Sequence, residues 1–253
     1  MTAFESQEYD ALMAYVQAPF VPDYPGALVV PAHEDNIIDA FNNPRGLVLH
    51  TPEEEADDTE VTPFYFSHRI YDAKGNQRRA STHFYHDSDG DVYQMVPVNI
   101  GAIANGLDGM PAPPWAISNI SLNLQTESTE IEGYAAGMNR TCPRGSRQWN
   151  SVVRWTEARS WVNGFPLLRE RVLGHYQLSN QRSDPGTLDI NGIVSDAQAL
   201  REIRLMAPEI DLIKLFAEWE GSCLEMAGLV SRRQKFPKGL IDRIQAILNL
   251  AKS

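Results

Sequence analysis

The clearest structural signal in the chain is residues 81–97, STHFYHDSDGDVYQMVP, in which two β-rich segments flank an Asp-Gly turn. Aromatic and β-branched residues favour extended strands, and Asp-Gly readily adopts the backbone angles that a tight hairpin turn needs. We therefore predict an antiparallel hairpin here. Within it, His83 is expected to be a structural residue of the sheet and His86 a surface residue.

Further strands and helices are predicted around this hairpin. Short apolar or alternating segments predict strands at Gly26–Val30, Leu47–Leu49, Ile120–Ser128 and in RVLGH, which ends at His175. A short helix is predicted over Asp35–Phe41, whereas residues 61–70 are ambiguous between helix and strand. Apolar residues recur at helical spacing between Trp149 and Val162, with Gly164 at the position of a C-cap. Strands mixed with helices indicate the α/β class.

The pattern becomes helical after Gly192. A Ser-x-x-Gln capping box at Ser195 predicts one helix, and Pro208 and Pro237 are predicted to begin two more. We therefore expect a main domain over residues 1–192 and a helical appendage of unknown role over residues 193–253.

Composition limits the possible partners. The 253 residues carry a formal net charge of −11, which disfavours nucleic-acid binding, because that requires clustered Lys and Arg. No apolar run is long enough to span a membrane, so membrane insertion is not expected. The acidic N-terminus does not resemble a signal peptide, and we expect the protein to be made in the cytoplasm.

Two histidines and one aspartate form a candidate metal site. His50 and His175 each end a predicted strand, and Asp184 opens an Asp-Pro-Gly turn. Two imidazoles and a carboxylate suit Zn²⁺ and leave a fourth position for water, as in catalytic zinc sites. The alternative is that both histidines are ordinary strand-end residues and that Asp-Pro-Gly is only a turn.

Five motifs in order resemble the type 2 N-acetylmuramoyl-L-alanine amidase family, which has the peptidoglycan-recognition-protein fold and includes many phage endolysins. The motifs are GLVLHT, TPFYF, STHFYHDSDGDVYQMVP, ISLNLQTES and GHYQLSNQRSDPG. The resemblance covers roughly residues 25–190 and leaves the helical tail unmatched. It implies a central mixed β-sheet flanked by helices, with a zinc ion at one end of the sheet.

The resemblance also assigns roles to individual residues. It implies that His50, His175 and Asp184 hold the zinc, and that Arg182, where many members have a lysine, stabilises an oxyanion. Thr82 stands where some phage members use a tyrosine, and Asn105 lies where several members have a His-Ala-Gly motif. Both are expected to contact substrate.

One expected residue is missing from the matched motifs. Many members carry a glutamate that activates water on the strand corresponding to SLNLQTES, and direct alignment places Gln125 there. Glutamine cannot accept the proton. Glu127 lies two positions further on and would point to the same face if the strand continues. Either Glu127 or a reoriented Gln125 is therefore expected to handle the water, or zinc alone activates it, or the protein is a poor catalyst.

The resemblance implies a zinc amidase that cuts the bond between N-acetylmuramic acid and L-alanine of peptidoglycan or of a muropeptide. The setting we expect is a phage endolysin that reaches the cell wall at host lysis, and a cytoplasmic recycling amidase is the neighbouring possibility. Two other classes remain open: a peptidoglycan-binding protein with a lapsed active site, favoured by Gln125, and a phage structural component. Oligomeric state and host cannot be read from the sequence.

Overall fold

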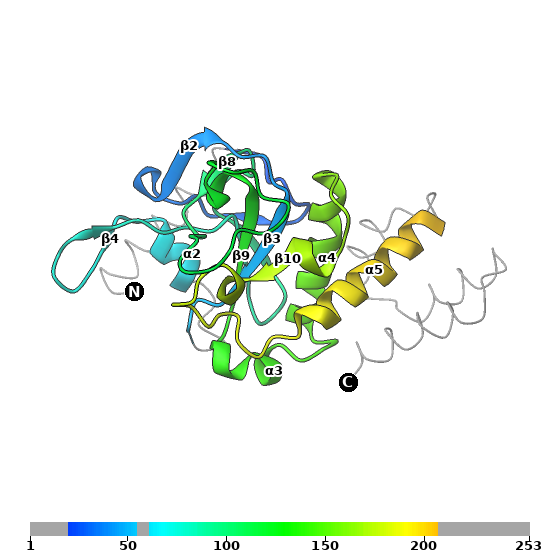
Figure 1. Ribbon diagram of the computed structural model, residues 1–253. Helices are drawn as coiled ribbons and strands as arrows, with labels where there is room; N and C mark the ends of the chain where they lie inside the picture. The colour runs from blue at the N-terminus through cyan, green and yellow to red at the C-terminus, as the bar shows by residue number, and fades with distance from the viewer. Residues whose placement is uncertain (1–19, 55–60, 207–253) are drawn as a thin grey trace.

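A mixed six-stranded sheet forms the centre of the molecule (Figure 1). The computed structural model describes residues 20–54 and 61–206. The sheet has the strand order β1-β7-β6-β9-β3-β10, and two smaller sheets pair β2 with β8 and β4 with β5. The mixed sheet flanked by helices that the family resemblance implies is thus confirmed.

The strands are short and the helices vary in length. The strands are β1 (Leu28–Val29), β2 (Ile37–Phe41), β3 (Gly46–His50), β4 (Ile70–Tyr71), β5 (Gln77–Arg78), β6 (Phe84–His86), β7 (Val92–Gln94), β8 (Ile100–Ala102), β9 (Thr126–Ile131) and β10 (Val172–Gly174). The α-helices are α2 (Val61–Phe66), α3 (Met138–Thr141), α4 (Arg147–Val162) and α5 (Ile190–Met206). The 3-10 helices are η1 (Glu34–Asn36), η2 (Leu122–Leu124), η3 (Ala135–Gly137), η4 (Arg169–Arg171) and η5 (His175–Gln177).

The predicted hairpin is present as β6 and β7, which pair antiparallel across the Asp-Gly turn. The other neighbours in the six-stranded sheet pair parallel: β1 with β7, β6 with β9, β9 with β3, and β3 with β10. Parallel strands end at the same edge of a sheet. The carboxyl ends of β9, β3 and β10 therefore lie together, which is the geometry that brings distant side chains to one place.

Strand β3 is buried along its whole length and supplies both faces of the core. Leu47 and Leu49 pack with Trp149 and Trp155 of α4, which lies across one face of the sheet. Val48 points the other way and packs in a second cluster with Trp115 and Leu173, among others. This alternation follows from the two-residue repeat of a strand, and it places His50 on the Val48 face, away from α4.

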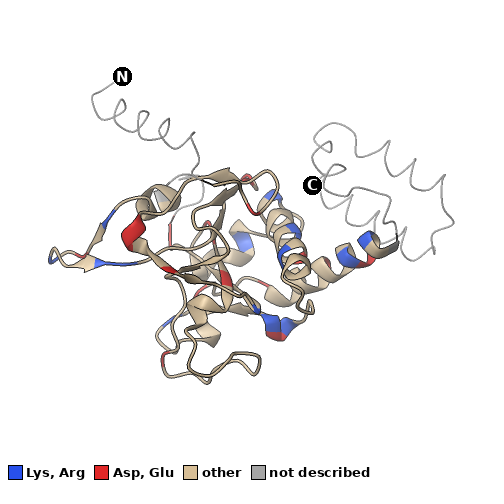
Figure 2. Ribbon diagram, turned by 90° about the horizontal axis from the view of Figure 1, so that it is seen from above, with Lys and Arg blue, Asp and Glu red and all other residues tan. Residues whose placement is uncertain are grey.

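Helices α4 and α5 pack side by side, as Figures 1 and 2 show. Ile193 and Val194 of α5 belong to the same core cluster as Trp149. At the far end of the pair, Glu157 of α4 accepts a hydrogen bond from Arg201 of α5 at 2.6 Å and forms an ion pair with Arg204 at 3.1 Å. The start of α5 is therefore an integral part of the main core.

Several predicted elements differ from the observed ones. Residues 35–41 form the end of η1 and strand β2 rather than a helix, because Ile37 and Ile38 pair antiparallel with residues of β8. The strand predicted over residues 120–128 begins only at Thr126, since Ser121 caps the turn η2 instead. The ambiguous segment, residues 61–70, forms α2 and then enters β4.

The C-terminal helix also begins elsewhere than predicted. It begins at Ile190, so Ser195 lies inside α5 and does not cap it. The first residues of the predicted appendage, Ile193 and Val194, pack in the main core, and the helices predicted after Pro208 and Pro237 lie outside the described residues. Within the described ranges, no helix combines the length and the apolar composition that a membrane span requires.

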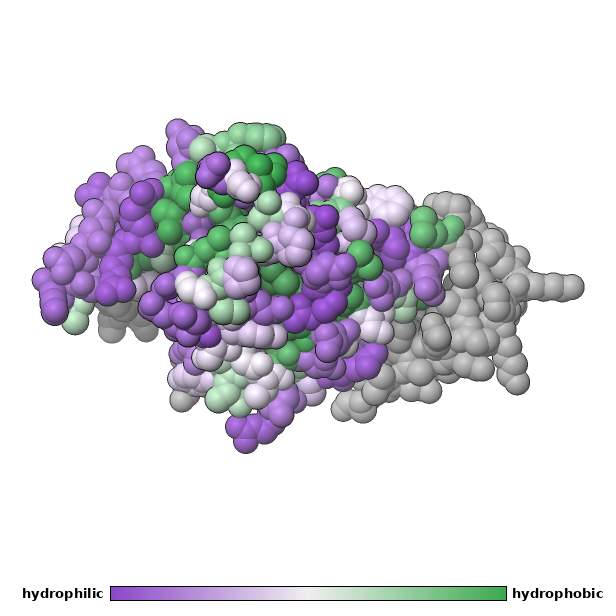
Figure 3. All heavy atoms as spheres, in the orientation of Figure 1, coloured by the Kyte–Doolittle hydropathy of each residue, from purple (hydrophilic) through white to green (hydrophobic). Residues whose placement is uncertain are grey.

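Apolar side chains gather on one part of the face drawn in Figure 3. They lie at the end of the molecule that bears β2 and β8, surrounded by mostly polar residues. Phe41 of β2 is the most exposed of the phenylalanines here, at 75%. Scattered exposed apolar residues are normal for a folded protein, and this group has no assigned role.

His86 is completely buried, which contradicts the predicted surface position. Its Nδ1 lies 2.7 Å from Oγ of Ser151, and its ring meets that of Trp155 edge-on. Within the described part of the chain, Nε2 has no hydrogen-bond partner. Burial, and then the positive charge of Arg154, lower the pKa of His86 to about 3.

We expect this histidine to weaken the fold in acid. Between pH 6.5 and 3 the unfolded chain binds a proton at His86 that the folded protein excludes, so the free energy of unfolding falls as the pH falls. The contribution is up to about 1.4 kcal/mol per pH unit and is absent above pH 6.5. Urea unfolding of the metal-free protein between pH 7.5 and 4.5 should therefore show a shallower pH dependence for His86→Asn than for the wild type. His68→Asn, at an exposed histidine, is the matched control. Parallel curves for wild type and His86→Asn would contradict the assignment.

Candidate metal centre

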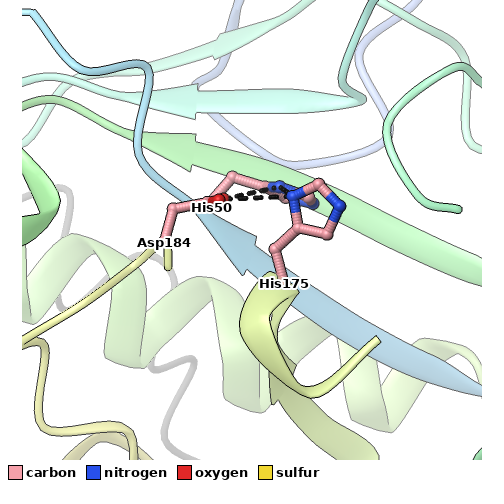
Figure 4. Close-up of side chains that lie close together, drawn as sticks. All are labelled: His50, His175 and Asp184. Atoms are coloured by element: carbon pink, nitrogen blue, oxygen red, sulfur yellow. Dashed lines mark hydrogen bonds and ion pairs between the residues drawn. The ribbon is translucent and has the colours of Figure 1, made fainter. Parts of the chain in front are cut away.

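Three side chains from two strand ends and one loop meet at the carboxyl edge of the sheet. His50 is the last residue of β3, and His175 directly follows β10. The two strands are parallel neighbours, with Gly174 paired to Leu49, so the histidines that follow these positions are adjacent. Figure 4 shows both rings and the carboxylate of Asp184 pointing toward one another. The sequence predicted these three residues as ligands, and the structure brings them together.

The three ligand atoms form a small triangle. The Nδ1 atoms of His50 and His175 are 3.1 Å apart, and Oδ2 of Asp184 lies 3.1 Å from the first and 3.2 Å from the second. The three side chains are between 4% and 13% exposed. Among the described residues, this is the one group of His, Cys, Asp and Glu side chains close enough to hold a metal ion.

The geometry and chemistry of the group fit zinc. Tetrahedral zinc with bonds of about 2.0–2.1 Å to nitrogen and oxygen requires ligand atoms about 3.3–3.4 Å apart. The observed separations of 3.1–3.2 Å are close to that value. Two imidazole nitrogens and one carboxylate oxygen leave one tetrahedral position for a water or a substrate atom.

The ionisation states also suit a metal site. Burial is the largest effect on His50 and lowers the pKa of its imidazole, although Asp184 opposes this. Burial raises the pKa of Asp184, but contacts with His175 and His50 outweigh it and hold that carboxyl well below its usual pKa. A neutral imidazole and an ionised carboxylate are the forms that bind metals.

The loop that carries Asp184 is fastened to its surroundings. The amide of Tyr176 donates to the carbonyl of Asp184 at 3.0 Å, and the amide of Thr187 donates to the carbonyl of Ala135 at 2.9 Å. Gly186 has a positive φ of 55°, and a Cβ atom there would lie 2.1 Å from the carbonyl oxygen of Ala135. Only glycine fits this close approach, which explains the glycine that ends the Asp-Pro-Gly sequence.

The two predicted substrate contacts are not available to a substrate. Thr82 is fully buried and donates to Oγ of Ser128 at 3.1 Å, so that prediction is wrong. Asn105 is 5% exposed, and its side-chain oxygen lies 2.8 Å from Nε2 of His50. Asn105 therefore contacts a predicted metal ligand rather than the solvent-facing opening of the site.

The predictions for Gln125 and Glu127 are also wrong. The side chain of Gln125 is buried against the 117–120 loop, where its amide bonds to the backbone of Ile117 and Ile120. Glu127 pairs with Leu47 and shares its face, on the α4 side of the sheet. There it accepts hydrogen bonds from Arg159 at 2.7 and 2.8 Å and from Asn163 at 2.6 Å, so its carboxylate is fully engaged away from the metal centre.

Glu130 is the acidic residue at the candidate site that the sequence motifs did not indicate. It is the register partner of His50, so the two side chains leave the same face of the sheet at the same edge. Its Oε2 atom is buried and has no hydrogen-bond partner among the described residues. Burial, and then the negative charges of Asp184 and Glu54, raise the pKa of its carboxyl well above the usual value.

Arg182 places a positive charge near Glu130. Its side chain is exposed, and its charge opposes the rise in the pKa of Glu130.

The sequence contained one signal that could have identified Glu130, namely its position near the end of a predicted strand. Using it requires the correct register of β9 against β3, because a shift of one residue moves each side chain of the strand to the opposite face of the sheet.

Comparisons with known proteins agree with this geometry. Residues 40–187 match the protein family described as N-acetylmuramoyl-L-alanine amidase, the family that the sequence motifs predicted. A selenomethionine derivative of AmpD is 18% identical, covers 70% of this chain and 99% of its own, and superposes with a TM-score of 0.52, which shows a shared fold.

Two other solved structures are similar at lower TM-scores. The catalytic domain of XlyA is 17% identical over 67% of this chain and 95% of its own, with a TM-score of 0.49. The N-acetylmuramoyl-L-alanine amidase LysC from Clostridium intestinale is 16% identical over 69% of this chain and 99% of its own, with a TM-score of 0.48. No curated protein sequence matches the chain.

The placement of Glu127 leads to a testable prediction. Glu127→Ala leaves the guanidinium of Arg159 buried without its partner, so we expect a loss of about 3–5 kcal/mol in the free energy of unfolding. The zinc affinity of the folded protein should not change, since Glu127 lies on the opposite face of the sheet from His50. Urea unfolding and zinc titration of the same preparation measure the two effects.

A double variant is the control for this prediction. Glu127→Met with Arg159→Met removes both charges and should recover part of the lost stability. A stable Glu127→Ala protein with weakened zinc binding would contradict a purely structural role for this residue.

Proposed function

Because this chain belongs to the N-acetylmuramoyl-L-alanine amidase family, we propose that its His50, His175 and Asp184 hold a zinc ion and that it hydrolyses peptidoglycan. The bond cut is the amide between the lactyl group of N-acetylmuramic acid and L-alanine of the stem peptide. The observation that carries this proposal is the buried triangle of two Nδ1 atoms and one carboxylate oxygen, with sides of 3.1–3.2 Å.

The metal and the chain have separate tasks in this proposal. Zinc, when bound, polarises the amide carbonyl and lowers the pKa of a water molecule to about 7. The chain fixes the three ligands through two adjacent strand ends and the fastened loop of Asp184.

Glu130 is the group we propose for proton transfer. Its carboxylate accepts a proton from the attacking water while the water oxygen bonds to the carbonyl carbon. It then returns that proton to the amide nitrogen as the carbon–nitrogen bond breaks. A raised pKa suits this role, because a general acid–base works best with a pKa near the working pH.

Arg182 is the group we propose for stabilising negative charge. Its exposed guanidinium is available to the carbonyl oxygen as that atom becomes an oxyanion. The planar fork of arginine provides two parallel N–H donors for this purpose, where a lysine would provide a single charge.

The alternative of an inactive peptidoglycan-binding protein loses its main support. It rested on Gln125 standing where an acid was expected, and Gln125 is instead a loop-bracing residue. Glu130 supplies a carboxylate on the face and at the edge where His50 lies. A protein that only binds has no need for a carboxylate whose buried Oε2 lacks a hydrogen-bond partner among the described residues, beside three potential metal ligands.

We further propose a phage endolysin as the biological setting, as the sequence motifs suggested, with the protein reaching the cell wall at host lysis. An endolysin acts on the intact, cross-linked wall, whereas a recycling amidase acts on soluble muropeptides. The two settings therefore differ in the size of the preferred substrate.

The first prediction is direct cleavage. Zinc-loaded protein incubated with purified sacculi should release stem peptides that have a free N-terminal L-alanine, detected by mass spectrometry. Asp184→Ala removes one ligand and should abolish the release. Soluble muropeptides form the parallel arm, and an endolysin should cut sacculi faster than these. Intact substrate in both arms, with zinc bound, would contradict the amidase.

The second prediction concerns Glu130. Glu130→Gln keeps the shape of the side chain but cannot take up a proton, so we expect kcat to fall by about 10²–10⁴-fold. Stability and zinc content should be retained, because the buried Oε2 has no hydrogen-bond partner to lose among the described residues.

Glu132→Gln is the matched control, two residues further along the chain. The carboxylate of Glu132 accepts a hydrogen bond from the amide of Ser88, and this contact lies outside the metal centre. The control should keep wild-type kcat. Equal rates for wild type and Glu130→Gln would exclude the proposed proton transfer.

A further inference from the structure

We propose that Asn105 is a positioning residue for His50, and that Thr126 holds Asn105 in the one orientation that leaves Nδ1 of His50 free for a metal. This inference rests on the zinc site of the proposed function and adds two residues to it. Neither Asn105 nor Thr126 is itself a ligand. Their role follows from counting hydrogen-bond donors and acceptors along a buried chain of four groups.

The chain of hydrogen bonds begins at Thr126. Its hydroxyl donates to the carbonyl of Leu122 at 2.7 Å. A hydroxyl has one hydrogen, so after this bond the oxygen of Thr126 has only lone pairs left. Any further polar partner of that oxygen must therefore be a donor.

Asn105 is that partner. Its Nδ2 amide donates to Oγ1 of Thr126 at 2.8 Å. The nitrogen and oxygen of an asparagine amide can be exchanged only if the hydrogen bonds allow it, and here the hydroxyl of Thr126 accepts only a donor. The amide nitrogen must face Thr126, and the amide oxygen must face the opposite way.

The amide oxygen of Asn105 faces His50. The distance between Oδ1 of Asn105 and Nε2 of His50 is 2.8 Å. The oxygen is an acceptor, so Nε2 must carry the hydrogen of the ring. A neutral imidazole has one such hydrogen, and Nδ1 of His50 therefore presents a lone pair.

That lone pair points at the metal position. Nδ1 of His50 is the atom that lies 3.1 Å from both Nδ1 of His175 and Oδ2 of Asp184. A ligand histidine commonly donates its other ring hydrogen to an oxygen acceptor, which orients the ring and makes the ligand nitrogen more basic. Asn105 provides that acceptor for His50.

The surroundings keep the chain of hydrogen bonds rigid. The side-chain oxygen of Asn123 accepts from the amides of Ala104 at 3.1 Å and Asn105 at 2.6 Å, which fixes the backbone at Asn105. Thr126 is fully buried and Asn105 is 5% exposed, so water has little access to either group. Thr126 and His50 also lie on the same face of the sheet. Thr126 pairs with Gly46, which is four residues before His50 on β3, and side chains on one strand return to the same face every two residues.

His175 provides an internal comparison. Within residues 20–54 and 61–206 its Nε2 makes no hydrogen bond, whereas its Nδ1 contacts Asp184. His50 is thus the histidine of the pair whose ring is oriented by a side-chain partner, and the effect of Asn105 should be specific to it.

Zinc affinity, measured by competition with a chromophoric chelator, tests the inference. Asn105→Leu removes the acceptor and should weaken zinc binding by about 10–100-fold. Thr126→Val removes the oxygen that orients Asn105 and should also weaken binding, whereas Thr126→Ser keeps that oxygen and should bind as the wild type does. Asn36→Leu is the control for losing a buried amide, since the side-chain amide of Asn36 donates to the carbonyls of Phe66 and His68 and, among the described residues, makes no hydrogen bond with His50, Asn105 or Thr126.

A second readout uses the unaltered protein, so it does not depend on a variant that folds. In the zinc-loaded wild type, NMR should show a slowly exchanging hydrogen on Nε2 of His50 and a faster one on His175. Equal exchange at both histidines would overturn the inference, as would equal zinc affinities for Thr126→Val and Thr126→Ser. Loss of affinity in Asn36→Leu matching that in Asn105→Leu would overturn it too.

These outcomes are separate from the test of the amidase. Wild-type protein that binds zinc, shows the protected hydrogen and leaves peptidoglycan intact would refute the proposed reaction and leave the role of Asn105 standing. Cleavage of peptidoglycan by the wild type, with identical zinc affinities in all variants, would support the proposed reaction and refute the role of Asn105.

Discussion

The parallel pairing of β3 with β9 on one side and β10 on the other is the constraint on which the site depends. Parallel strands end at one edge, and the register joins His50 to Glu130 and Leu49 to Gly174, the residue before His175. Residues up to 125 positions apart in the chain thereby come within hydrogen-bond distance. The buried leucines and valine of β3 anchor this edge, since they pack against both layers of the core.

The two faces of the sheet separate two kinds of charge. On the α4 face, Glu127 and Arg159 neutralise each other in a bidentate pair, which satisfies both groups and supports the core. On the other face, Glu130 forms no ion pair with any cation in residues 20–54 and 61–206, and its pKa is raised by burial and by neighbouring acids. One strand therefore carries two glutamates in opposite environments, and the alternation of side chains along the strand decides which face each one takes.

The candidate metal centre extends beyond its three proposed ligands. Asn105, Thr126 and the carbonyl of Leu122 form a buried series of hydrogen bonds behind His50. Gly186 and Thr187 hold the loop of Asp184 against Ala135. Hydrogen bonds and packing contacts of this kind fix the orientation of the ligand side chains, and a site that lacked them would hold its ligands more loosely.

The sequence by itself determined the class of fold, the hairpin at residues 81–97, the long helix α4 and the identity of the three residues that meet at the edge of the sheet. Turn residues and helical periodicity are enough for the hairpin and for α4, whereas the fold and the three site residues followed from the resemblance of five ordered motifs to a known family. Only the tertiary structure decided which acid belongs to the site, where Asn105 points and that His86 is buried. The choice of acid depends on the register between β3 and β9, because a shift of one residue exchanges the face of Glu127 for that of Glu130. The other two depend on contacts between segments distant in sequence, those of Asn105 with His50 and of His86 with Ser151 and Trp155.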